Sequence, residues 1–107
     1  MQQLTTEELK QKINSGENFV LDLFATWCGP CKIMLNNLTR VNEQLLQESV
    51  GQPKYNIYKY DIDGDRDFVV NELNVRSVPT IKIFKSGEEV FSKPGVMSPQ
   101  QVIELLN

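Results

Sequence analysis

Only two cysteines occur in the chain, and they lie three positions apart in the segment Cys28-Gly29-Pro30-Cys31. A disulfide that stabilises a fold usually closes a much longer loop, so a purely structural role for this pair is disfavoured. Two residues at this spacing in the first turn of a helix face the same side, and their sulfur atoms can be joined with little rearrangement. The pattern therefore indicates thiols with a chemical role, either redox exchange or metal binding.

A zinc site is the first alternative for the two thiols. Tetrahedral zinc usually takes four Cys, His or acidic ligands, and no second cluster of such residues accompanies Cys28 and Cys31. The chain has no histidine, which excludes an imidazole base, an imidazole metal ligand and a catalytic triad built on histidine. We therefore expect no bound metal, and redox exchange is the favoured chemistry.

A calcium loop is a second metal alternative, further along the chain. Acidic residues recur after a predicted strand, at Asp61, Asp63, Asp65 and Asp67. A calcium loop needs glycine where Arg66 stands, so we expect a solvated acidic turn that caps the next helix.

Two predicted elements place the cysteine pair. Residues 19–25 form an unbroken apolar run with one acid in it, as expected of a strand that is covered on both faces. From Cys31 onward, apolar residues recur at steps of three and four, which predicts a long helix over residues 30–47. The pair thus lies where a buried strand ends and a helix begins, the edge of an open α/β sheet at which active sites usually occur.

The start of this helix favours a thiolate at Cys28. Unpaired backbone amides and the positive end of the helix dipole face its sulfur atom. Gly29 lets another chain approach closely, and Pro30 suits the first helical turn because its missing N–H would have no partner there. We predict that Cys28 is the nucleophile and that Cys31, one turn further in and less exposed, reacts second.

Asp22 is the acid inside the apolar run. A lone carboxylate in a buried strand is unfavourable as an anion, so its pKa should be raised. A raised pKa suits a proton acceptor, and a purely structural acid at the end of the strand is the alternative.

The remaining patterns predict an α/β fold in which strands alternate with helices before a closing hairpin and helix. Thr5 and Glu8 form a capping box for the first helix, and Ser98, Pro99 and Gln101 cap the last one. The other elements are predicted as a helix over residues 6–14, a strand over 55–60, a helix over 66–73, and hairpin strands over 80–84 and 89–92. The expected result is a mixed sheet with helices on both faces.

Composition limits the possible functions. The 107 residues are 40% hydrophobic and 23% charged, which suits one globular domain over residues 1–107. The net charge of -3 and the scattered basic residues leave no face for a run of phosphates, so nucleic acid is not an expected partner. Residues 1–8 have neither a basic start nor an apolar run, so we expect no secretory signal, no membrane anchor and a cytoplasmic location.

Several motifs resemble those of the thioredoxin family, and the resemblance covers nearly the whole chain. The matching segments are Asp22, residues 25–32, residues 59–63, Val78-Pro79-Thr80, residues 84–88 and Gly95. Within residues 25–32 the match to the family's active site is residue for residue. The resemblance implies the thioredoxin fold, a central mixed sheet of about four to five strands flanked by about four helices.

By this resemblance, Cys28 attacks a disulfide in a client protein, and Cys31 then attacks Cys28 to release the reduced client. The chain would be a protein-disulfide reductase that binds no cofactor itself and acts as a monomer. Its expected partners are disulfide-containing client proteins and a thioredoxin reductase, usually a flavoprotein that draws on NADPH. The resemblance also implies that Asp22 helps to deprotonate Cys31 and that Lys59 lies nearby and moderates the charge of Asp22.

Four residues are expected to form the surface that substrates touch. The resemblance implies a cis-proline loop at Pro79 that faces the cysteines and holds substrate backbone, with Trp27, Val78 and Gly95 beside it. The alternatives are an ordinary proline at the start of a strand, a tryptophan in the core and, for Lys59, a solvated lysine.

Several features depart from the family's pattern. Asn36 stands where the family usually has a proline that kinks the long helix, and asparagine neither removes a backbone donor nor forces a bend. Phe24 replaces a common tryptophan, which removes a fluorescence probe of the redox state. About four residues precede the first capping box, so we expect a stunted first edge strand. The loop over residues 47–54 looks slightly longer than usual, and we assign it no function.

Two other functions are compatible with the same fold. One is an oxidase or isomerase of disulfides, and the other is a binding module without catalysis. Gly29 and Pro30 between the cysteines, together with Asp22, favour the reductase, because oxidising relatives usually carry other dipeptides and act outside the cytosol. An intact cysteine pair disfavours the binding module.

Overall fold

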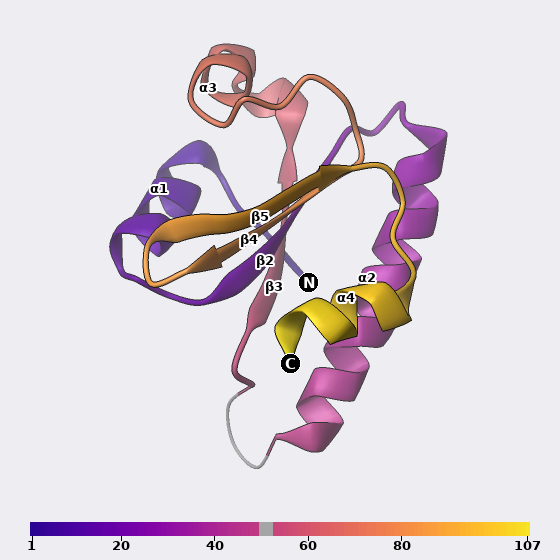
Figure 1. Cartoon of the computed structure of the whole chain (residues 1–107). Coiled ribbons are helices and arrows are strands. Elements are labelled where there is room, and N and C mark those ends of the chain that lie inside the picture. The colour runs from indigo at the N-terminus through magenta and orange to yellow at the C-terminus, as the bar shows by residue number, and fades with distance from the viewer. Residues whose placement is uncertain (50–52) are drawn as a thin grey trace.

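The computed structural model describes residues 1–49 and 53–107 and has the predicted α/β architecture (Figure 1). Its strands are β1 (Gln2–Gln3), β2 (Phe19–Phe24), β3 (Asn56–Asp61), β4 (Thr80–Lys85) and β5 (Glu88–Pro94). Its helices are α1 (Thr6–Asn14), α2 (Gly29–Glu48), α3 (Arg66–Asn71) and α4 (Pro99–Leu106), with a short 3₁₀ helix η1 (Ile62–Gly64). The strand order is β1-β3-β2-β4-β5; β1, β3 and β2 are parallel, and β4 is antiparallel to both β2 and β5.

Helices cover both faces of the sheet (Figure 1). Leu9 of α1 and Phe68 of α3 belong to a buried cluster on one face. Met34 of α2 and Val102 of α4 belong to a second cluster on the other face. The predicted mixed sheet with helices on both sides is therefore confirmed.

β2 lies in the middle of the sheet, between β3 and β4. Phe19 and Leu21 join the cluster with α1 and α3, Val20 joins the cluster with α2, and none of the three has exposed surface. This burial on both faces confirms the prediction from the apolar run. Because side chains alternate along a strand, Asp22 lies on the same face as Val20, the face that α2 covers.

α2 begins and ends one residue beyond the predicted limits and runs through Asn36 without a break. Its buried stripe consists of Cys31, Met34, Leu38 and Val41. Asparagine keeps its backbone N–H, so the exposed Asn36 leaves the helical hydrogen bonding intact. The loop predicted over residues 47–54 includes residues 50–52, which lie outside the described residues.

Element ends differ from the predictions by one or two residues. α3 is shorter than the predicted 66–73, because the amides of Glu72 and Leu73 both donate to the carbonyl of Phe68 and close the last turn there. The limits of β2, β3, β4 and β5 shift by one residue or two. β1 has only two residues, which confirms the expected stunted edge strand.

The hairpin of β4 and β5 shows the expected turn and an unexpected buried lysine. Ser86 and Gly87 have positive φ, as a tight two-residue hairpin turn requires. The alternating residues of β4 are typical of a strand with one exposed face. Lys82 is nevertheless buried, where its ammonium group donates hydrogen bonds to Glu89 and, at 3.2 Å, to the hydroxyl of Ser92.

Candidate active site

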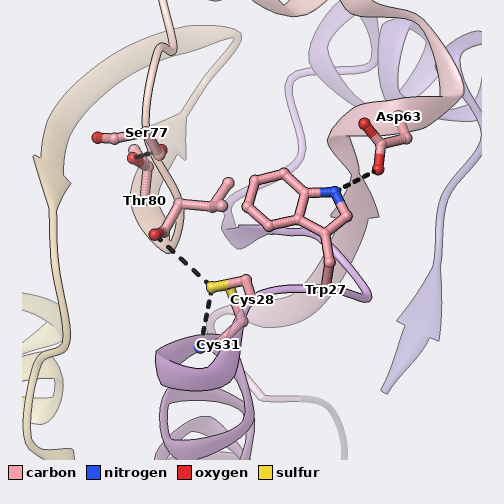
Figure 2. Close-up of a disulfide and its surroundings, with 7 residues drawn as sticks. Trp27, Cys28, Cys31, Asp63, Ser77 and Thr80 are labelled. Atoms are coloured by element: carbon pink, nitrogen blue, oxygen red, sulfur yellow. Dashed lines mark hydrogen bonds between the residues drawn. A yellow bond between two sulfur atoms is a disulfide. The ribbon is translucent and has the colours of Figure 1, made fainter.

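Cys28 is the N-cap residue of α2, and its disulfide with Cys31 spans the first turn of this helix (Figure 2). Cys28 has extended backbone angles (φ -92°, ψ 110°), and Pro30 follows within the first turn. The Cα atoms of the two cysteines are 5.3 Å apart, a usual distance for a disulfide. The predicted position of the pair, after a buried strand and at the start of a long helix, is confirmed.

The helix start supplies a hydrogen bond to the sulfur of Cys28. The backbone N–H of Cys31 donates to Cys28 Sγ at 3.2 Å. The same donor, with the positive end of the helix, stabilises negative charge on this sulfur once the disulfide is reduced. Both cysteines are buried in the disulfide form, Cys28 with 6% and Cys31 with 4% of its surface exposed. The expected difference in exposure is therefore small in this state.

Asp22 lies on the α2 face of β2 with no exposed surface. Neither oxygen of its carboxyl group has a hydrogen-bond partner among the described residues. Burial raises the pKa of Asp22 from 3.8 to about 7, and the nearby charge of Lys59 acts in the opposite direction. The raised pKa expected from the sequence is confirmed, and a group that titrates near neutral pH can accept and release a proton there.

One cavity of about 220 Å³ connects the carboxyl group to the inner cysteine. Its lining residues are Asp22, Phe24, Ala25, Thr26, Cys31, Lys32, Leu35 and Lys59. Lys59 is the register partner of Asp22 across β2 and β3, and its Nζ atom lies 5.5 Å from the centre of the Phe24 ring. The cavity is large enough to hold water, so Asp22 and Cys31 need no direct contact to exchange a proton.

The loop that precedes β4 faces Cys28 from the other side. The peptide bond between Val78 and Pro79 is cis, and the carbonyl oxygen of Val78 lies 3.7 Å from Cys28 Sγ. Gly95, with φ at 96°, donates its N–H to the carbonyl of Pro79 at 2.8 Å. The predicted cis-proline loop thus lies opposite the cysteines, and Gly95 lies beside it.

Trp27 is on the surface and not in the core, because 63% of it is exposed. Its indole Nε1–H donates to Asp63 Oδ2 at 2.9 Å (Figure 2). We use the term rim for Trp27, Val78, Pro79 and Gly95, the residues predicted to touch substrates.

Sequence reasoning missed the link between Asp63 and Trp27. Asp63 was expected in a solvated turn, and the neighbouring Asp65 does cap α3, where its side chain accepts from the Phe68 amide at 3.1 Å. A signal for the link exists in the sequence, since Asp63 follows β3 and Trp27 follows β2. The carboxyl ends of parallel neighbouring strands meet at one edge of a sheet.

Residues 1–49 and 53–107 contain no group of three or more Cys, Asp or Glu side chains placed to hold a metal ion. No described helix combines the length and the apolar character that crossing a membrane requires.

Comparison with known proteins agrees with this geometry. A family model described as thioredoxin matches residues 1–107. A thioredoxin of Staphylococcus saprophyticus is 35% identical over 103 residues, which cover 96% of this chain and 91% of that protein. Thioredoxin-1 of Saccharomyces cerevisiae is 35% identical over 86 residues, which cover 80% of this chain and 76% of that protein.

A solved structure gives the same result for the fold. The crystal structure of chloroplastic thioredoxin z superposes with a TM-score of 0.82 at 26% identity, over 99% of this chain and 90% of that one. The structural similarity, the matched family model and the disulfide at the start of α2 all agree on the family of the chain. The chain belongs to the thioredoxin family and is a dithiol–disulfide oxidoreductase whose redox pair is Cys28 and Cys31.

Proposed function

We propose that the chain is a protein-disulfide reductase that carries electrons from a thioredoxin reductase to disulfides in client proteins. It acts as a monomer in the cytoplasm and contributes to redox homeostasis there. The observation that carries the proposal is the buried carboxyl group of Asp22, which opens onto the same cavity as Cys31. This arrangement supports a role for Asp22 as the proton acceptor of Cys31, the second thiol of the reaction.

In the first step, the reduced chain attacks its client. The thiolate of Cys28 attacks one sulfur of the client disulfide, a bond forms between Cys28 and that sulfur, and the other client sulfur leaves as a thiolate. The helix start and the N–H of Cys31 support the thiolate of Cys28 before attack. The surface at Gly29 is open to a client, since a Cβ there would meet nothing within 4 Å apart from its chain neighbours.

In the second step, Cys31 resolves the mixed disulfide. Asp22 accepts the thiol proton of Cys31 through the cavity, and the resulting thiolate attacks Cys28. The bond between Cys28 and the client breaks, the client sulfur leaves with its electron pair, and the proton returns to it or to solvent. The chain has then lost two electrons and holds the disulfide seen in the structure.

Lys59 and Pro30 have supporting roles in this proposal. The charge of Lys59 keeps the pKa of Asp22 from rising further, so the carboxyl group is able to ionise near neutral pH. Pro30 lies in the first turn of α2, where its missing N–H would have no helical partner, and the amide of Cys31, the next residue, donates to the nucleophile.

The rim supplies the contact with client proteins. Trp27 offers an exposed aromatic surface beside the disulfide, and Val78 lies with its carbonyl close to Cys28. Gly95 holds the loop of Pro79 through its hydrogen bond. An extended client segment that lies against this loop would present its disulfide to Cys28.

The reduction of insulin by dithiothreitol tests the proposal. The wild-type chain should accelerate precipitation of the insulin B chain, and Cys28→Ser should abolish the acceleration. Cys31→Ser keeps the nucleophile and lacks the resolving thiol, so it should accumulate mixed disulfides with clients that mass spectrometry can identify. A wild-type chain without activity would contradict the proposal.

The redox potential separates a reductase from an oxidase. Equilibration of the chain with glutathione buffers gives the potential of the Cys28–Cys31 pair. A potential more reducing than that of cytosolic glutathione supports the reductase. A potential far more oxidising than glutathione would instead favour the oxidase.

A further inference from the structure

Trp27 lies at the rim with most of its surface exposed. With 63% of the residue exposed, packing alone leaves the ring free to adopt several rotamers. The hydrogen bond from Nε1–H to Asp63 Oδ2, at 2.9 Å, is directional and selects one orientation (Figure 2). The orientation of the indole therefore depends on how firmly Asp63 itself is held.

Arg66 holds the other oxygen of the same carboxylate. Its Nε and one terminal guanidinium nitrogen both donate to Asp63 Oδ1, at 3.0 and 2.7 Å. Each oxygen of the Asp63 carboxylate therefore accepts hydrogen bonds from a different residue, Oδ1 from Arg66 and Oδ2 from Trp27. Hydrogen bonds from Arg66, and then from Trp27, lower the pKa of Asp63, so the carboxylate is ionised at neutral pH.

The backbone around Asp63 is also fixed. The N–H of Asp63 donates to the side chain of Asp61 at 2.9 Å, which orders the short helix η1. Arg66 is the first residue of α3, whose N-cap is Asp65. The backbone is therefore ordered at both Asp63 and Arg66, by η1 and by the start of α3. The orientation of the Asp63 carboxylate then depends only on its side-chain torsions.

We propose that Arg66 is a positioning residue for client recognition: it orients the carboxylate of Asp63, which in turn orients the indole of Trp27 beside the nucleophile. The inference rests on the proposed contact between Trp27 and client proteins. The planar guanidinium presents two converging N–H groups to one oxygen, so it fixes the rotation of the carboxylate as well as its charge. A single ammonium group would supply the charge alone.

Fluorescence can measure the link directly, because Trp27 is the one tryptophan in the chain. In oxidised Arg66→Gln, the indole should be more mobile, with a lower anisotropy and stronger quenching by acrylamide than in wild type. Arg66→Lys should resemble Arg66→Gln more than wild type. Arg40→Gln, at an exposed arginine of α2 outside the Asp63 network, is the matched control and should leave both signals unchanged.

Kinetics then test whether this orientation matters for clients. Arg66→Gln and Arg66→Lys should each raise the KM for insulin by about threefold with little change in kcat, a size that matches the loss of a partly exposed ion pair. The rate with a small aromatic disulfide such as dithionitrobenzoate should stay unchanged, because a small molecule reaches Cys28 without covering the rim. Urea denaturation of each variant checks that α3 remains folded.

Four results would overturn the inference. These are unchanged fluorescence in Arg66→Gln, full rescue of fluorescence and KM by Arg66→Lys, altered fluorescence with an unchanged KM for insulin, and an equal rate loss with the small disulfide. Rescue by lysine would assign the effect of Arg66 to its charge. An inactive wild type would instead refute the proposed function, while the fluorescence comparison would still test the link between Arg66 and Trp27.

Discussion

The buried carboxyl group of Asp22 makes the stability of the fold depend on pH. Burial raises its pKa from 3.8 to about 7, although the charge of Lys59 opposes the rise. Between pH 3.8 and about pH 7, the carboxyl group of Asp22 is protonated in the folded chain and ionised in the unfolded chain. The contribution of Asp22 to the free energy of unfolding is therefore most favourable at low pH. It falls as the pH rises from 3.8 to about 7 and is constant at higher pH.

The size of the effect follows from the shift. About three pKa units at ~1.4 kcal/mol each destabilise the folded chain by about 4 kcal/mol at about pH 8.5. At about pH 4.5 the same shift destabilises the folded chain by only about 1 kcal/mol. Asp22→Asn keeps the shape and removes the titration, so its stability relative to wild type should improve by about 3 kcal/mol between these two pH values. The unpaired amide of the variant adds a pH-independent penalty, which cancels in this difference.

Urea denaturation followed by circular dichroism measures the effect in the oxidised chain. Wild type and Asp22→Asn are compared at both pH values, and Glu43→Gln, at an exposed carboxyl group of α2, is the matched control. The control should show a difference from wild type that hardly changes with pH. A stability of Asp22→Asn relative to wild type that stays constant, or that falls as the pH rises, would refute the reasoning about Asp22.

Other contacts give further predictions, each to be measured by urea denaturation. Glu89→Gln should lower the free energy of unfolding by about 2 kcal/mol, because it leaves the buried ammonium group of Lys82 without its counter-charge. Lys82→Met removes that charge as well and should lower the free energy of unfolding less; the reverse order would contradict this account. Gly87→Ala should cost about 1 kcal/mol or more, since φ is +84° and the new Cβ would lie 3.2 Å from the Ile13 carbonyl. Gly64→Ala, with free space around it and no positive φ, should cost clearly less. Ser98→Ala removes half of a capping box and should cost about 1 kcal/mol; no loss would mean that packing alone holds α4.

Features set by local chemistry could be predicted from the sequence. The capping boxes of Thr5 and Ser98 are present, because each involves residues three positions apart. The placement of Cys28 at a helix start follows from the strand and helix patterns on either side of it. The burial of Asp22 follows from the apolar run that contains it.

Features set by distant partners could not be predicted in the same way. The burial of Lys82 depends on Glu89, which reaches it across a register shift between Ile83 and Phe84 in the pairing of β4 with β5. A pattern within one strand contains no information about an irregularity in its neighbour. The contact between Trp27 and Asp63 joins residues that are 36 positions apart in the chain, so no local pattern predicts it and only the meeting of β2 and β3 at one sheet edge indicates it.

The position of Asp22 is unfavourable for stability and suited to chemistry. A neutral side chain of similar size there would avoid a penalty of about 4 kcal/mol at high pH, which is a large part of the stability of a small domain. A carboxyl group with an ordinary pKa would be a weak acceptor for a thiol proton, and one far above neutrality would stay protonated. Burial alone moves the pKa upward, and Lys59 limits the rise. The same burial that weakens the fold therefore produces the pKa of about 7 that the proposed proton transfer from Cys31 requires.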